Sequence, residues 1–503
     1  MAESDPPRFA GYIDGKFVIG GGSGLRVENP SDGSIIAAFP GVSESQVEAA
    51  ILAARRSFDA RVWSGRPVKE RADWLRRLIE AMEARTDAIT DVLVAETGCP
   101  RHSGSMTAQL ATPLRMGREC IELFETLPET EEHALPTHER RNRLGQSIRS
   151  FRRYSPLGVV AGIAAYNFPL HTGVWKVVPA LIAGNSVVLR PNPLTPLSAL
   201  AFAHAAQAVG LPPGVLNVVL EAGVTGAQLL TSHVAVDMVT FTGSSAVGAQ
   251  VATQAAASFK RVHLELGGKS AQVFLPDAAE RVVNAAVGVC MGHAGQGCTH
   301  GTRLFVPKAQ KAELVERTAA AFRALKVGHS SDPATQVGPV ISADQVARCE
   351  HFVGLAVEHG GRVAAGGRRP ASLRNGYFFE PTLLDVPDNR NPAAQEEIFG
   401  PVVVMIGYRD IEHAVEMAND SQYGLSGYVH GRDAGQALDV AMRIDSGAVH
   451  VNGGLSSSYV PFGGIKASGI GYERGVEGLR SCQRLTAHSV TGYGRCDGSH
   501  FVR

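Results

Sequence analysis

Cys298 is the residue of this sequence best suited to nucleophilic chemistry. It ends the segment Gly295-Gln296-Gly297-Cys298. A cysteine in such a glycine-flanked turn exposes its sulfur beside backbone N–H groups, a setting that can lower the pKa of the thiol and present a thiolate. The alternative is a packed structural cysteine, because cysteine is among the residue types most often buried.

Glu265 is a candidate general base. It lies in an apolar run that ends in the glycine pair 267–268, and a carboxylate leaving a sheet into such a turn favours a raised pKa. An ordinary acid at the end of a strand is the alternative. The run Gly268-Lys269-Ser270 also resembles the end of a phosphate-binding loop, but that motif needs a glycine where His263 stands, so the motif is excluded.

Asn167 is a candidate oxyanion donor. It stands between Tyr166 and the pair Phe168-Pro169, at the end of an expected buried strand. Its side-chain N–H₂ could donate to an oxyanion beside a nucleophile. The alternative is a turn asparagine before proline, which is common.

The segment from Phe241 to Gly248 is a candidate pyrophosphate site. It follows a strand and opens a helix, so backbone N–H groups and a hydroxyl gather where a phosphate could bind. It lacks the GxGxxG pattern, and a turn capped by serine is the alternative.

The elements that must position these residues alternate between strand and helix. This alternation predicts parallel α/β sheets in two domains of similar size. At the N-terminus, Ser43 and Gln46 form a capping box before a helix, and a second helix is expected over 69–84. The expected strands are 159–164, 186–189, 215–219, 238–241 and 263–266 in the first series, and 271–275, 303–306, 402–408, 427–429 and 448–451 in the second.

Composition narrows the class of protein. The chain has 503 residues, 44% hydrophobic and 19% charged, which indicates a globular protein of two or three domains. The 48 basic and 48 acidic residues balance, so there is no bulk field for nucleic acid or an anionic membrane. The seven cysteines form no CxxC pair, which disfavours zinc and suits reduced thiols in a cytoplasm.

Two segments allow a different interpretation. The stretch 157–189 is apolar with one charge, Lys176, and could suggest a membrane span. Its breaks at Asn167 and Gly184 favour two buried strands around a helix. The arginine-rich stretch 139–153 could bind nucleic acid, but no basic neighbours extend it, and a solvated or subunit-bridging ribbon is favoured.

Taken together, the motifs resemble those of the aldehyde dehydrogenase superfamily. The resemblance runs over nearly the whole chain, with order and spacing both matching. The segments that carry it are Tyr166 to Leu170, Phe241 to Gly248, Glu265 to Ser270, Gly295 to Cys298, Glu397 to Pro401 and Pro461 to Gly469.

The resemblance implies a fold with two Rossmann-like α/β domains and a bridging β-ribbon. The coenzyme-binding domain would comprise 1–134 and 155–264, and the catalytic domain 265–452. The bridging segment would comprise 135–154 and 484–503, and would join a homodimer or homotetramer.

The resemblance also implies a chemistry that is hydrolytic rather than CoA-acylating. Cys298 would attack an aldehyde carbonyl, and the Asn167 amide and the Cys298 N–H would hold the oxyanion. After hydride transfer, Glu265 would activate water to hydrolyse the thioester. Glu473 matches a second carboxylate that would relay protons, with a structural acid in the last helix as an equal alternative. No metal is needed.

NAD is the implied cofactor, with NADP as the alternative. The family commonly has Lys-Pro-x-Glu where this chain has Arg190 and Pro193, and the missing acid removes a discriminator against a 2′-phosphate. Arg190 could bond the ribose or pair with a phosphate. The resemblance assigns the remaining contacts to Ser244 at the pyrophosphate, to Glu397 at the nicotinamide ribose, and to Gly243, Gly248, Phe399 and Phe168, with Gln345 and Arg348 as further candidates.

The expected substrate is a medium-chain or bulky apolar aldehyde: aliphatic, aromatic or terpenoid. Ser456 is small where some relatives have an aromatic ring, which predicts a wide mouth. No arginine is expected among the wall residues, which disfavours a dicarboxylic semialdehyde, although an NADP-dependent semialdehyde dehydrogenase and a CoA-acylating enzyme are the alternatives. The walls would be Phe168, Thr172, Trp175, Thr299 and Ser456, while His171, His293 and His300 are expected to be packed or at the surface rather than catalytic.

Overall fold

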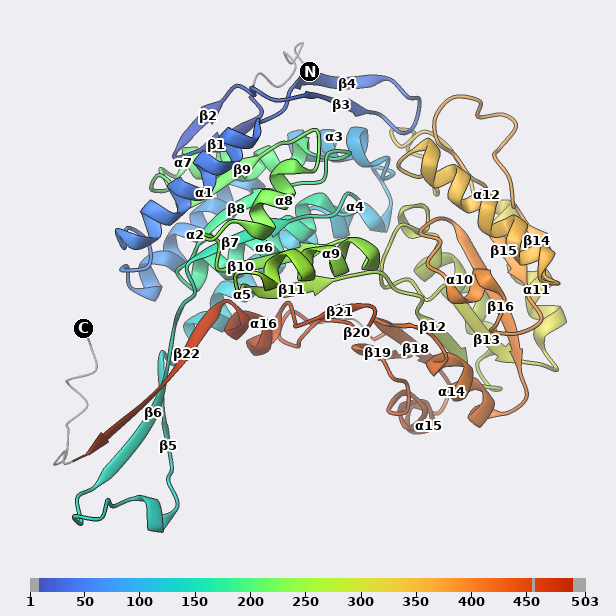
Figure 1. Ribbon diagram of the computed structural model, residues 1–503. Coiled ribbons are helices and arrows are strands. Elements are labelled where there is room, and N and C mark those ends of the chain that lie inside the picture. Colours follow the sequence, from blue (N-terminus) through green and yellow to red (C-terminus); the bar gives the residue numbers. More distant parts are fainter. Residues whose placement is uncertain (1–8, 455–456, 492–503) are drawn as a thin grey trace.

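The computed structural model describes residues 9–454 and 457–491, and shows two large sheets and a separate ribbon. Figure 1 shows the ribbon reaching away from the two sheet-containing bodies. The expected α/β class, with two large sheets and a β-ribbon, is confirmed by this arrangement of sheets.

The first sheet has eight strands, and its centre is parallel. Alternate strand side chains pack on opposite faces. Residues of β7 and β8 pack against α1 on one face and α6 on the other. The strands in sheet order are β2 (Lys16–Val18), β1 (Gly11–Ile13), β9 (Leu216–Val219), β8 (Ser186–Arg190), β7 (Val159–Ile163), β10 (Met238–Thr242), β11 (Arg261–Glu265) and β21 (Gly469–Ile470).

The helices around this sheet begin close to where the sequence places them. Ser43 and Gln46 form the expected capping box of α1, and the expected helix over 69–84 is α2. Two short strands, β3 (Gly24–Glu28) and β4 (Ile35–Pro40), form a hairpin beside them. The helices are α1 (Glu44–Asp59), α2 (Val68–Glu83), α3 (Thr86–Thr97), α4 (Gly104–Gln109), α5 (Ala111–Glu125), α6 (Pro169–Ile182), α7 (Leu200–Ala208), α8 (Thr225–Ser232) and α9 (Ser245–Ala256).

The second sheet has seven strands, which are parallel except at the β14 edge. Its core is a separate hydrophobic cluster. The strands in order are β14 (Arg362–Ala365), β15 (Thr382–Asp385), β16 (Val402–Tyr408), β13 (Arg303–Pro307), β12 (Ala271–Phe274), β18 (Ser426–His430) and β19 (Ala448–Val451). The later helices are α10 (Val282–Cys290), α11 (Lys311–Ala324), α12 (Ala343–Glu358), α13 (Pro392–Gln395), α14 (Ile411–Asn419), α15 (Ala434–Ala441) and α16 (Gly475–Ser481), and the pair β17 (Tyr423–Gly424) and β20 (Ile465–Lys466) lies apart from the sheet.

The arginine-rich stretch forms part of a three-stranded ribbon. Strand β6 (Ile148–Pro156) pairs with β5 (Thr130–His133) and with β22 (Gln483–Thr491). Arg149 and Arg152 form ion pairs with Glu132 and Glu131 of β5. The basic charge is therefore partly neutralised within the ribbon.

The apolar stretch 157–189 folds as expected into β7, α6 and β8. Lys176 lies in α6 with 1% of its surface exposed. Across 9–454 and 457–491, no helix combines the length and apolarity needed to cross a bilayer.

The order of strands in the first sheet marks where a ligand would bind. From β7 the chain proceeds to β8 and β9 on one side, then returns to β10 and β11 on the other. In open parallel sheets, ligands bind outside the carboxyl ends of the strands at such a reversal. Asn167 follows β7 and Gly243 follows β10, so both stand at this edge.

The division into domains at 134, 154, 264 and 452 stays a prediction. One strand of the first sheet, β21, comes from residues that the prediction assigned to no domain.

Arg303 generates a prediction about stability. Its buried guanidinium donates to the carbonyls of Lys269, Met417 and Ala418 and to the Asn389 amide oxygen. We expect Arg303→Met to lower the free energy of unfolding by about 3–5 kcal/mol, because these acceptors lose a buried charged donor. Exposed Arg317, paired with Glu313 on a helix surface, is the matched control: Arg317→Met should change it by less than about 0.5 kcal/mol. Denaturant midpoints measure both, and equal small effects would contradict the assignment.

Candidate active site

The loop carrying Cys298 is clamped between two backbone segments. It follows α10, and its backbone takes the left-handed conformation at His293, Ala294 and Gly295. A Cβ at Gly268 would overlap the carbonyl oxygen of Cys298. The loop therefore lies directly on the glycine pair that follows Glu265, and a side chain at Gly268 would push it away.

The thiol of Cys298 corrects one expectation. Burial raises its pKa to about 12, and the carboxylates of Glu397 and Glu265 raise it further, while the backbone N–H groups of Cys298 and Thr299 act in the opposite direction. The sequence-based expectation of a lowered pKa is wrong for the protein alone, because desolvation and two carboxylates outweigh the loop amides. A thiolate here needs an additional positive charge.

Asn167 lies against the cysteine loop. Its Nδ2 donates to the carbonyl of Gln296 at 2.9 Å, and the side chain of Gln109 donates to its backbone carbonyl at 2.7 Å. Both contacts are buried, so the amide is fixed two residues before Cys298. The second N–H of the amide could serve as the oxyanion donor, and that role stays a prediction.

Glu265 ends β11 and is nearly inaccessible. Burial raises its pKa to about 7, opposed by a hydrogen bond from His263. Oε1 lies 3.1 Å from His263 Nε2, whereas Oε2 has no hydrogen-bond partner within the described chain. The group is thus a carboxylate that changes protonation near neutral pH and keeps one oxygen free, as a general base requires.

Glu473 lies close to the same cluster. It precedes α16, and its backbone pairs with Phe462. Its Oε1 lies 3.1 Å from Lys176 Nζ and 3.7 Å from His263 Nδ1. The structure therefore connects the two carboxylates through His263, a residue that the sequence analysis considered only in excluding a phosphate-binding loop.

The segment after β10 carries the residues predicted to bind the pyrophosphate, Ser244 and two glycines. Ser244 is exposed and caps the N-terminus of α9, accepting from Val247 N–H. A Cβ at Gly243 or Gly248 would meet the Phe241 ring or the Leu266 side chain. Packing thus explains why both positions are glycine. The predicted contact between their backbones and a cofactor stays a prediction.

Glu397 is held beside the cysteine. Its Oε1 accepts from Gly268 N–H at 2.8 Å, and burial raises its pKa to about 7. Phe399, at φ 62°, packs edge-on against Tyr166.

Gln345 and Arg348 support the backbone of this segment. Gln345 donates to the carbonyls of Ile398 and Phe399, and Arg348 donates to that of Glu397. In the structure they position the Glu397 loop.

Arg190, a candidate for bonding the ribose or pairing with a phosphate, is engaged within the protein. It ends β8 with 5% of its surface exposed. Its Nε lies 3.2 Å from Glu221 Oε2, and its Nη2 donates to the carbonyl of Gly223. Its charge is therefore already paired with a neighbouring carboxylate at the end of β9.

The expected wall residues lie around α6 and the cysteine loop. Thr172 donates its hydroxyl to the carbonyl of Phe168, so its methyl is left for contact. Trp175 packs 5.3 Å from the Phe462 ring. Thr299 accepts from Tyr428 through its carbonyl. Ser456 lies outside the described residues.

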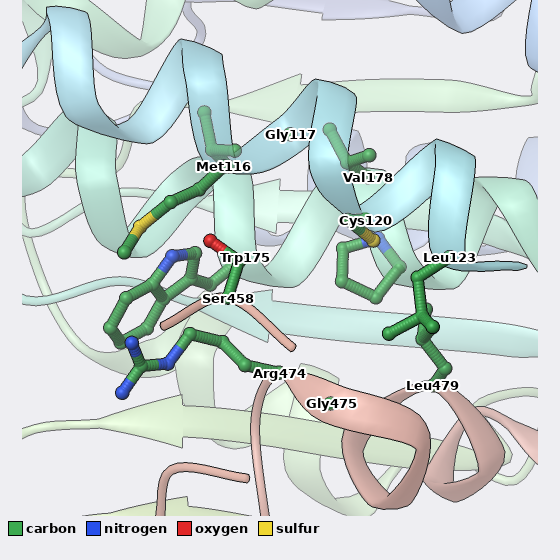
Figure 2. Close-up of a pocket in the computed structure, with 12 residues that line it drawn as sticks. Met116, Gly117, Cys120, Leu123, Trp175, Val178, Ser458, Arg474, Gly475 and Leu479 are labelled. Atoms are coloured by element: carbon green, nitrogen blue, oxygen red, sulfur yellow. The ribbon is translucent and has the colours of Figure 1, made fainter. Parts of the chain in front are cut away.

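Arg474 is the wall residue that the sequence analysis missed. Its guanidinium lies over the rings of Trp175 and Phe462, at 4.9 and 4.6 Å from their centroids. Figure 2 shows it beside the Trp175 indole, at the edge of a small cavity that Ser458 also lines. The backbone at Arg474 has φ 61° and ψ 173°, a region that only glycine adopts freely.

The sequence analysis expected no arginine among the wall residues; the structure places Arg474 against one of them, Trp175, and a role for it at the substrate stays a prediction. Glu473 drew attention to this turn in the sequence, but nothing in the residue order predicts the unusual backbone that turns the next side chain onto the aromatic rings.

Three histidines near the site are packed. Burial lowers the pKa of His171, His293 and His300 to about 4, 3 and 4. They are neutral near pH 7. Within 9–454 and 457–491, no cluster of histidine, cysteine or acidic residues is arranged to hold a metal ion.

Two known dehydrogenases are similar to this chain over nearly its whole length. A 3-succinoylsemialdehyde-pyridine dehydrogenase of a Pseudomonas species is 37% identical over 96% of this chain and 98% of its own. A geranial dehydrogenase of Castellaniella defragrans is 35% identical over 92% and 95% of the two chains.

Solved structures are similar over the same length. A betaine aldehyde dehydrogenase variant of Staphylococcus aureus, in complex with NAD⁺, has a TM-score of 0.91 and 30% identity, covering 97% of each chain. A mutant of aldehyde dehydrogenase C of Pseudomonas syringae, complexed with NAD⁺ and octanal, has a TM-score of 0.90 and 33% identity over 99% of each. The model of the aldehyde dehydrogenase family matches residues 18–487. The chain therefore belongs to the aldehyde dehydrogenase family.

Proposed function

We propose that this protein oxidises a medium-chain, aromatic or terpenoid aldehyde to the carboxylic acid, with NAD as cofactor and Cys298 as nucleophile. The observation that carries the proposal is the proximity of Cys298, Glu265 and Asn167 beside the glycine pair 267–268, where Glu265 and Asn167 are buried and Cys298 is half-buried. Those residues supply a nucleophile, a base and an amide donor, which acyl transfer through a thioester requires.

In the first half of the reaction, Cys298 forms a bond to the aldehyde carbon. The thiol proton leaves to solvent, and the carbonyl oxygen becomes an oxyanion that the Asn167 amide and the Cys298 N–H stabilise. When bound, NAD supplies a hydride-accepting ring whose positive charge also favours the thiolate.

In the second half, a water oxygen attacks the thioester carbon. Glu265 takes the proton from that water, the carbon–sulfur bond breaks, and Cys298 regains its thiolate. The free oxygen of Glu265, without a partner within the described chain, is the atom we assign to the water. The alternative product, an acyl-CoA, needs no base, so Glu265 favours hydrolysis.

The cofactor fits at the reversal of strand order. We assign the pyrophosphate to Ser244 and the first turn of α9, because the N-terminus of a helix favours an anion. Glu397, half-buried near Cys298, would offer its second oxygen to the nicotinamide ribose. Phe399 and Phe168 would flank the ring from the loops after Glu397 and β7.

NAD is favoured over NADP by the pairing of Arg190. A 2′-phosphate needs an available positive charge, and the charge of Arg190 is already matched by Glu221.

The walls favour a bulky apolar substrate. Phe168, Trp175 and Phe462 bring aromatic surface to the site. Arg474 supports a second candidate, an aldehyde with a distal carboxylate or carbonyl. The side-chain atoms Trp175 Nε1 and Arg474 Nε are buried and have no partner within the described residues, so both could donate to such a group.

We further propose a homodimer or homotetramer in the cytoplasm. Leu144 at the tip of the ribbon is 82% exposed, and Leu485 of β22 is 53% exposed, as an unoccupied subunit contact would be. The six described cysteines are free thiols, which suits a reducing compartment.

Two substitutions test the reaction. We expect Cys298→Ala to abolish NADH formation. Glu265→Gln should keep a single burst of NADH but slow steady turnover at least about 100-fold, because the water loses its base. In the wild type, hydrolysis should rise with pH through about 7, as Glu265 ionises, and then level off.

Stopped-flow absorbance and product analysis measure these effects. A wild type that releases acyl-CoA and no free acid would favour the CoA-acylating alternative, and unchanged turnover in Glu265→Gln would refute the assignment of the base.

The Arg190 pairing predicts cofactor preference. We expect Glu221→Gln to raise the ratio of kcat/KM for NADP to that for NAD about tenfold, because the freed guanidinium can bind the 2′-phosphate. Exposed Glu412, which pairs with Arg443, supplies the control variant Glu412→Gln. A ratio that does not move in either variant would count against this site.

Arg474 predicts a split among substrates. Replacing it by leucine should lower kcat/KM about tenfold or more for an aldehyde with a distal carboxylate, since a charged hydrogen bond is lost. The value for octanal should change less than about threefold. Steady-state kinetics with a panel of aldehydes measures both values. If the wild type turned over only short or acidic aldehydes, the proposal of an apolar substrate would be refuted.

A further inference from the structure

His263 and Glu265 share one face of the first sheet because strand side chains alternate. Thr240 and Thr242 are their partners on the neighbouring parallel strand β10. Lys176 of α6 covers this face, and Glu473 approaches it from the segment before α16. A buried polar cluster therefore lies beside Glu265 and contacts it through Oε1.

The ammonium group of Lys176 donates all of its hydrogen bonds to other members of the cluster. An ammonium group has three N–H donors and no acceptor. Its Nζ lies 2.7 Å from Thr242 Oγ1, 3.1 Å from Glu473 Oε1 and 3.4 Å from Thr240 Oγ1. The hydroxyl oxygen of Thr240 accepts from the lysine, so its single hydrogen is left to donate.

His263 offers a ring nitrogen within hydrogen-bond distance of that hydroxyl. Thr240 Oγ1 lies 3.2 Å from His263 Nδ1. A neutral imidazole has one N–H and one acceptor nitrogen. With Nδ1 accepting, the proton stands on Nε2, which faces Glu265 Oε1 at 3.1 Å.

We propose that His263 is a positioning residue for Glu265. A one-way hydrogen-bond chain from Lys176 through Thr240 sets its Nε2–H tautomer, and that N–H holds Oε1 of Glu265 so that Oε2 faces the water. This inference rests on the proposed function and adds a residue that deacylation needs and acylation does not.

The groups around His263 and Glu265 determine whether loss of His263 raises or lowers the pKa of Glu265. The groups that face this pair are Lys176 and Thr240 from α6 and β10, Glu473 and Arg474 from the segment before α16, and Cys298 from its loop. Burial favours the protonated acid, whereas the His263 hydrogen bond favours the carboxylate. Without His263, a smaller fraction of Glu265 would be ionised at neutral pH, so less base would be available to accept a proton from water.

The test compares acylation with deacylation in single turnovers. NADH absorbance follows acylation, and intact mass after rapid quenching follows loss of the acyl group. We expect His263→Leu to keep the burst rate within about threefold, to slow deacylation at pH 7 at least about tenfold, and to move the midpoint of its pH profile up by about one unit. His263→Gln, which retains an N–H donor, should recover part of the loss.

The chain itself is tested at Thr240. Thr240→Val should shift the midpoint in the same direction by a smaller amount, and Thr240→Ser should recover most of that shift. Combined with His263→Leu, Thr240→Val should add little, because both act through one nitrogen. His204→Gln, a partly buried histidine on α7 that packs on Phe17, controls for loss of an imidazole.

A second readout needs no turnover. The infrared band of the protonated Glu265 carboxyl, identified by its absence in Glu265→Gln, should titrate about one unit higher in His263→Leu than in the wild type. An unshifted band and an unshifted pH profile would overturn the proposal, as would loss of the burst with normal deacylation. Absence of NADH from every aldehyde in the wild type would instead contradict the proposed function, and the infrared titration would still decide the role of His263.

Discussion

The close approach of the 267–268 backbone to the cysteine loop is the constraint on which the site depends. This segment carries the chain from β11 of the first sheet to β12 of the second. A side chain at Gly268 would overlap the carbonyl of Cys298, and the N–H of the same residue holds Glu397. One crossing therefore joins the base, the nucleophile and the carboxylate assigned to the cofactor.

That crossing also determines the electrostatics. Bringing Glu265, Glu397 and Cys298 together and removing them from much of the solvent raises the pKa of all three. The two acids gain pKa values near neutrality, which suits groups that exchange protons during a reaction. The thiol is less acidic, so the protein alone stores it in an unreactive form. A bound cofactor with a positively charged ring would act against this shift, which would restrict the thiolate to the complex that can use it.

Behind the base lies a second buried layer of charge. Lys176 places its three donors on two hydroxyls and on Glu473, and the two strands β10 and β11 supply the groups that connect this layer to Glu265. Buried charge is tolerable only when it is paired and hydrogen-bonded. Because a lysine can only donate hydrogen bonds, the groups around Lys176 must accept from it.

The position of Arg474 against the aromatic wall residues depends on the conformation of its own backbone. Arg474 adopts dihedral angles suited to glycine and thereby lays its guanidinium over Trp175 and Phe462. Such strain is found where surrounding structure and function maintain it. An aromatic wall with a cation stacked on it accommodates apolar tails and also offers donors to an acceptor group.

The sequence by itself determined the strands and helices, and the residue types of the site, because apolar periodicity and glycine-rich turns are local properties. The expected strands of both sheets and the capping box at Ser43 follow from neighbours along the chain. Only the tertiary structure decided the raised pKa of Cys298, the pairing of Arg190 with Glu221, the position of Arg474 and the bridge at His263. Each of these depends on groups distant in the sequence, whose burial and distance are set by how the sheets and helices pack.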